Sequence, residues 1–155
     1  MTQEDIQLLS KDLAARLPYG VKVLLENEGE RLTGVLDAIF PNENRAIVTE
    51  LNKPIAAINV RCGGFDIEEN IVRPYLRLMS SMTKEEKREY LSFIGGKRPF
   101  DCDFSAYPIE YTFVYEHDIN SYIDWFNKHH FDYRGLIEKG LALEAPEGMY
   151  NIKKK

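Results

Sequence analysis

The sequence of 155 residues predicts an α+β fold with an N-terminal helix, a small antiparallel bent sheet or barrel of about five strands, and a helical C-terminal segment. Three observations predict this class. Apolar residues recur at helical spacing near the N-terminus, short β-branched and apolar runs follow as far as residue 72, and helical periodicity returns in the second half. Because no repeat and no linker interrupts the chain, we expect one composite domain over 1–155. Its parts are a helix plus β subregion at 1–78, a mainly helical subregion at 79–150 and a tail at 151–155.

The first expected element is an amphipathic helix from Thr2 to Leu17. Thr2 and Asp5 have the spacing of a capping box, with Asp in place of the usual Glu or Gln. Pro18 and Gly20 end the helix. Its buried stripe is expected to consist of Ile6, Leu9, Leu13 and Leu17.

Short strands are expected next. Val21–Leu25 and Arg31–Phe40 flank the polar segment 27–30, which is typical of a hairpin. The turn residues 41–44 then separate this hairpin from a further strand, Arg45–Thr49. The series continues with Ile55–Val60 and Asp66–Val72.

The second half is predicted to be helical, with one more strand. Thr83 and Glu86 form a capping box at the start of a helix over Lys84–Ile94. The remaining predicted elements are a strand at Glu110–Tyr115, a helix at Ile119–His130, a short helix at Arg134–Lys139 between Asp132 as N-cap and Gly140 as stop, and a tail from Pro146 onward.

Composition narrows the classes of function. The apolar and charged fractions, 44% and 29%, are ordinary for a soluble domain, and the net charge of −5 disfavours broad nucleic-acid affinity. Cys62 and Cys102 are not part of a CxxC pair, which excludes a cysteine zinc site. We expect no cofactor. Residues 1–5 lack a basic region and no apolar segment follows them, so we expect no signal peptide and a cytoplasmic protein.

The stretch 125–136, WFNKHHFDYRGL, concentrates aromatic and ionisable side chains. Successive helical residues point about 100° apart, so His129 and His130 cannot both chelate one metal as an i, i+4 pair does. We therefore predict no metal site. An enzyme or metal protein centred on His129 and His130, with His117 and Asp132 folding towards them, is kept as the third hypothesis.

The leading hypothesis is a non-catalytic binding protein that acts through a protein partner. Its interaction surface would consist of Tyr122, Trp125, His129, Tyr133 and Arg134, because interfaces favour aromatic residues and arginine. The alternative is a nucleic-acid-binding module built on the small barrel, with a local basic face. That face would consist of Lys22, Arg31, Arg45 and Arg61.

Two resemblances accompany these hypotheses. The segment 21–48 resembles the first motif of Sm-like or SH3-like barrels in the spacing of Gly34, Leu36 and Asn44, although Phe40 replaces the usual acidic residue. In 60–63 a cysteine interrupts the Arg-Gly pair of the second motif. These departures fall where RNA would be contacted, so this resemblance implies fold more than function.

The chain is also similar to short uncharacterised proteins encoded by prophages and mobile elements of gut anaerobes. The similar segments are LLSKDL through RLPYGV at 8–21, RPYLRLMSSMT at 73–83, and DWFN through PEGMY at 124–150. No biochemical activity follows from this resemblance, because these proteins are uncharacterised. The resemblance implies an accessory protein of a mobile element, acting on a host or element protein.

Overall fold

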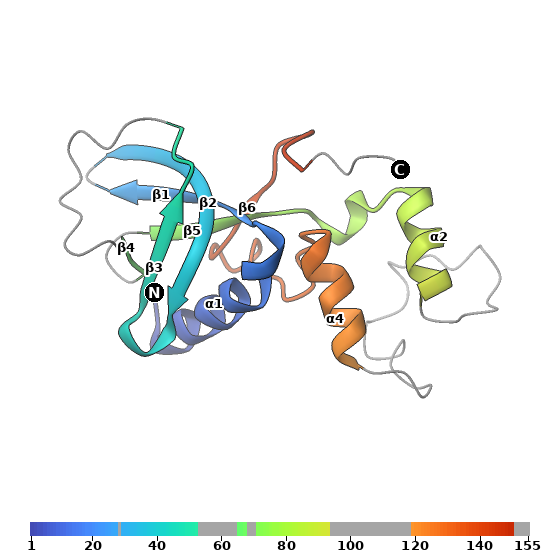
Figure 1. Ribbon diagram of the computed structural model, residues 1–155, viewed down its shortest axis with the longest axis horizontal. Coiled ribbons are helices and arrows are strands. Elements are labelled where there is room, and N and C mark those ends of the chain that lie inside the picture. The colour runs from blue at the N-terminus through green and yellow to red at the C-terminus, as the bar shows by residue number, and fades with distance from the viewer. Residues whose placement is uncertain (28, 53–64, 68–70, 94–118, 151–155) are drawn as a thin grey trace.

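The computed structural model describes residues 1–27, 29–52, 65–67, 71–93 and 119–150. It confirms the α+β class: a helix near the N-terminus, an open mixed sheet and a helix from the C-terminal half (Figure 1). The sheet lies at one end of the molecule with α1 beside it, helix α2 lies at the other end, and α4 lies between them (Figure 1). Among the described residues, no helix is both long enough and apolar enough to cross a membrane.

Helix α1 (Gln3–Arg16) begins at the predicted capping box. The Asp5 amide donates to the Thr2 hydroxyl over 3.1 Å, and the Thr2 amide donates to the Asp5 carboxylate over 2.9 Å. Ile6, Leu9 and Leu13 are buried as predicted, while Leu17 is only half-buried in the following 3-10 turn η1 (Leu17–Tyr19).

The described residues form a sheet of six strands in the order β4-β3-β2-β1-β5-β6. Five are antiparallel, and β6 joins β5 in parallel. The strands are β1 (Lys22–Asn27), β2 (Glu30–Phe40), β3 (Arg45–Thr49), β4 (Phe65–Asp66), β5 (Ile71–Leu76) and β6 (Leu143–Glu144). The described part of the sheet does not close into a barrel, because β4 and β6 form its two ends.

The predicted hairpin and the strand Arg45–Thr49 are confirmed. The predicted strand Asp66–Val72 is wrong, because the chain there contributes to two strands with different neighbours: β4 pairs with β3, and β5 pairs with β1. Val72, Pro74 and Leu76 are buried on one side of β5. The alternation of buried and less buried side chains therefore begins at Val72, the last residue of the predicted strand. The predicted strands Ile55–Val60 and Glu110–Tyr115 lie outside the described residues.

Strand β2 is bent and pairs with two neighbouring strands. Its first half pairs with β1 and its second half with β3, with a register shift between Leu36 and Ala38. Gly34 lies where the two halves meet. A Cβ atom there would be 2.5 Å from Val48 Cγ1 and 2.6 Å from the Thr49 carbonyl oxygen, so only glycine allows this close approach.

Helices α2 (Lys84–Phe93) and α4 (Ile119–Lys128) contribute to an aromatic core. The capping box at α2 is confirmed: the Glu86 amide donates to the Thr83 hydroxyl, and the Thr83 amide donates to the Glu86 carboxylate. The helix predicted over Ile119–His130 is confirmed, although it ends at Lys128. The buried members of this core are Met82, Tyr90, Tyr122, Trp125, Phe126 and Phe131.

Two predictions for the C-terminal region are wrong. Arg134–Lys139 forms turns and no regular helix, because Gly135 has a φ of +68°. The segment from Pro146 to Tyr150 is not a tail. The Tyr150 hydroxyl accepts from the Lys22 amide over 2.9 Å and donates to the Tyr75 carbonyl over 2.8 Å, so this side chain connects β1 to β5.

Candidate functional site

The aromatic-histidine stretch makes a corner after α4. His130 has a φ of +59°, and its carbonyl accepts from the Arg77 amide over 2.8 Å. The Asp132 amide in turn donates to the Arg77 carbonyl over 2.8 Å, so Phe131 lies beside the extension of β5 as an isolated parallel bridge. The corner is therefore hydrogen-bonded to the sheet on both sides of Phe131.

The predicted interaction surface is divided by this corner. Tyr122, Trp125 and His129 are only 3%, 5% and 5% exposed, so three of the five residues lie inside the described structure. The Trp125 ring stacks on that of His129, with centroids 4.0 Å apart, because both side chains fill the aromatic core below α4. Tyr133 and Arg134, beyond the corner, are the two that are partly exposed, with the Arg134 side chain 16% exposed.

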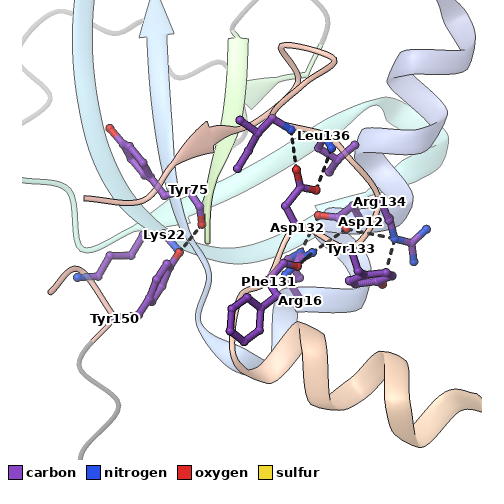
Figure 2. Close-up of polar contacts among 11 residues, drawn as sticks. Asp12, Arg16, Lys22, Tyr75, Phe131, Asp132, Tyr133, Arg134, Leu136 and Tyr150 are labelled. Carbon is purple, nitrogen blue, oxygen red and sulfur yellow. Dashed lines mark hydrogen bonds and ion pairs between the residues drawn. The ribbon is translucent and has the colours of Figure 1, made fainter. Parts of the chain in front are cut away.

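A fully buried ion pair supports the corner from α1. The Arg16 guanidinium donates to both carboxylate oxygens of Asp12, over 2.7 and 3.1 Å, and to the Phe131 carbonyl over 2.8 Å (Figure 2). Both side chains are 0% exposed. Arg16 thus connects the end of α1 to the turn after α4, and it satisfies a carbonyl that the corner leaves without a partner in the sheet.

Arg134 approaches the same carboxylate from the surface side. Its Nε lies 3.2 Å from Asp12 Oδ1 and donates to the Tyr133 hydroxyl over 3.0 Å. The terminal nitrogens of Arg134 have no partner among the described residues, and Figure 2 shows them on the side away from Asp12. The Tyr133 ring stacks on Phe126, with centroids 5.7 Å apart. We call these two residues the Tyr133–Arg134 corner, as distinct from the corner at 130–132 that precedes them.

Asp132 holds the turn that follows. Its two carboxylate oxygens accept from the amides of Leu136 and Ile137, each over 2.8 Å (Figure 2). The predicted capping role is therefore present, but the capped segment is a turn and not a helix. An aspartate used in this way has both oxygens engaged by the main chain.

The two histidines have different surroundings. His129 Nδ1 lies 2.9 Å from the Trp125 carbonyl oxygen, one helical turn earlier. His130 is stacked on Tyr150, with ring centroids 3.8 Å apart, and its Nδ1 has no hydrogen-bond partner among the described residues. Burial, and then the charges of Arg16, His129, Arg77 and Lys22, lower the pKa of His130 to about 3. Burial raises the pKa of the Tyr150 phenol.

The third hypothesis would need these groups to converge on one point. In the described ranges, no three histidine, cysteine, aspartate or glutamate side chains are grouped so that they could hold a metal ion. His117 lies outside the described residues. His129, His130 and Asp132 have separate structural contacts, as described above.

The predicted basic face is only partly assembled. Lys22 lies on the same face of β1 as Glu26, and Arg31 is opposite Glu26 on β2, whereas Arg45 is opposite Phe40 at the other end of β2. Arg61 lies outside the described residues. A cation that sequence reasoning missed, Arg73 of β5, joins this face: Arg73 and Arg31 are 2.7 and 3.1 Å from the carboxylate of Glu26.

Sequence reasoning also missed Asp12 and Arg16. Their signal is positional: with Leu9 and Leu13 they recur at i, i+3, i+4 and i+7, so two opposite charges lie on the stripe that the apolar residues mark as buried. Comparison with known proteins adds no further residue, since no family model, no curated protein and no solved structure matches this chain.

Proposed function

We propose that this chain is a non-catalytic binding protein that recognises a protein partner through the Tyr133–Arg134 corner. The observation that carries the proposal is the arrangement of Arg134: Asp12 and Tyr133 hold its Nε, its terminal nitrogens lie on the side away from Asp12 (Figure 2), and its side chain is 16% exposed. An arginine and a tyrosine held in this way are typical of the few residues that supply most of the binding energy at an interface.

The surroundings of the corner support a binding role over a catalytic one. Asp132 is engaged by two amides, and His129 contacts a carbonyl of the preceding helix α4. The ionisable groups around Arg134 therefore serve to position the backbone and this side chain. The resemblance to proteins of prophages and mobile elements suggests that the protein acts in the cytoplasm as an accessory factor, with a host or element protein as its partner.

The test is affinity capture from a cell that produces the protein. We expect one partner to be recovered with the wild type and to be reduced at least about tenfold with Arg134→Ala, the loss expected of an interface residue worth more than about 1.4 kcal/mol. Arg88→Ala, an exposed arginine on α2, is the matched control and should recover the partner fully. A partner recovered equally with all three proteins, or with none, would refute the proposal.

One observation favours the alternative function, nucleic-acid binding. Lys22, Arg31 and Arg73 share one face of the sheet, with Glu26 as the acid between the two arginines. Single-stranded RNA or DNA on this face should bind with an affinity that falls steeply as salt rises. Fluorescence anisotropy with labelled oligonucleotides at two salt concentrations tests this, and absent or salt-independent binding would remove the alternative.

A further inference from the structure

We infer that the group recognised at the Tyr133–Arg134 corner is a carboxylate, supplied by an acidic side chain of the partner. This inference rests on the function proposed above and names the chemistry of its ligand. The two terminal nitrogens of Arg134 would bind the two oxygens of one carboxylate, which is the planar, bidentate geometry that a guanidinium favours. The Tyr133 ring beside them would contact the methylene groups that carry the acid.

The position of Arg134 is set before any ligand arrives. A free arginine side chain loses rotamer freedom when it is fixed in a complex, and this loss weakens binding. Here Asp12 Oδ1, at 3.2 Å, and the Tyr133 hydroxyl, at 3.0 Å, already hold Nε, which orients the guanidinium plane. Asp12 is itself fixed, since Arg16 donates to both of its oxygens. The chain thus holds one edge of the guanidinium and leaves the other for a ligand.

The charge around the corner favours a monoanion over a phosphate. Arg134 is ion-paired with buried Asp12, which is also paired with buried Arg16, so these three groups together carry one positive charge. Phosphate carries close to two negative charges at neutral pH and is commonly met by a cluster of arginines. A single carboxylate adds one charge and needs two donors, which Arg134 provides.

There is also room for an approaching chain. Gly135, directly after Arg134, has a φ of +68°, and a Cβ atom built on it would meet no atom of the described part of the chain within 4 Å. The backbone beside the guanidinium is therefore open on this side. The turn is nevertheless fixed, because Asp132 accepts from the amides of Leu136 and Ile137 just beyond it.

The decisive measurement is the ¹H–¹⁵N resonance of Arg134 Nε in the full chain, assigned by its loss in Arg134→Lys. The probes are a short blocked peptide with two glutamates and one phenylalanine, the same peptide with glutamine in place of glutamate, and inorganic phosphate. We expect a saturable shift with the glutamate peptide only. An equal shift with the glutamine peptide, tighter binding of phosphate, or no shift with any probe would overturn the inference.

Substitutions separate this inference from the proposed function. In the capture experiment, Arg134→Lys keeps the charge but removes the bidentate fork, so we expect recovery to fall about tenfold. Tyr133→Phe keeps the ring but removes one contact of Nε, and we expect a smaller loss. If Arg134→Ala abolishes capture while Arg134→Lys does not weaken it, the Tyr133–Arg134 corner is the interface, but the inference that it binds a carboxylate is wrong. If Arg134→Ala has no effect on capture, the proposed function itself fails.

Discussion

Asp12 and Arg16 form a bidentate ion pair that is completely buried between α1 and the turn after α4, with its two bonds at 2.7 and 3.1 Å. A buried pair of this kind adds little stability compared with apolar residues of the same size, but the loss of one partner leaves a charge without compensation. In this protein the pair also fixes Arg134, so the same two residues influence both stability and the proposed interface.

Removal of the buried cation should be costly. We expect Arg16→Met to lower the free energy of unfolding by about 3–5 kcal/mol, because Asp12 loses its main partner and the Phe131 carbonyl loses its donor. Urea denaturation measures the change. The control is Arg31→Met, which removes a cation whose side chain is 68% exposed and should cost no more than about 1 kcal/mol. Equal losses in the two variants would contradict this account.

The stability of the protein should depend on pH through His130. Its folded pKa of about 3 lies below the ordinary value of 6.5, so the unfolded chain binds a proton that the folded chain excludes. The stabilisation is fully present above pH 6.5 and is lost as the pH falls towards 3, with a slope approaching about 1.4 kcal/mol per pH unit. In the folded state a proton on Nδ1 would also find no acceptor among the residues that the structure describes.

The variant for this test is His130→Asn. Asparagine tolerates the left-handed backbone that His130 adopts, and it does not titrate. We expect chemical denaturation at a series of pH values to show a slope smaller by about one proton in this variant. The same slope in both proteins would mean that His130 is not the group responsible.

Gly34 should not tolerate a side chain. Alanine there would place its methyl group within 3 Å of Val48, Thr49 and Leu51, and we expect Gly34→Ala to cost about 1–3 kcal/mol through displacement of β3. Gly140→Ala separates this steric cost from backbone strain, because Gly140 has a φ of +72° and a Cβ atom there would have no described residue within 4 Å. Its expected cost is about 1 kcal/mol. Thermal unfolding of both variants provides the comparison.

The Tyr150 hydroxyl should contribute to stability although it lies near the C-terminus. Tyr150→Phe keeps the ring on His130 but leaves the Lys22 amide and the Tyr75 carbonyl without this partner, at a cost of about 1–3 kcal/mol. Amide exchange at Lys22 should become faster. Tyr19→Phe, at a half-buried tyrosine of the turn after α1, is the control and should leave that exchange unchanged.

The sequence predicted best those features that depend on residues close together in the chain. Thr2 with Asp5 and Thr83 with Glu86 are three residues apart, and each pair makes the predicted capping box. The hairpin of β1 and β2 depends in the same way on a short polar turn between two apolar runs. The helix predicted over Arg134–Lys139 failed because Gly135 adopts a left-handed conformation, which glycine permits but does not require.

Sequence alone was thus enough for the class of the fold, the start of each capped helix and the presence of the first hairpin. The burial of Trp125 and His129, and the partial exposure of Tyr133 and Arg134, became visible only in the folded chain. Folding also brings Arg16 to the Phe131 carbonyl 115 positions later, and Tyr150 to Lys22 across 128 positions. The physical reason is that local hydrogen bonds follow from spacing along the chain, whereas a contact between distant residues forms only when the whole chain has closed around it.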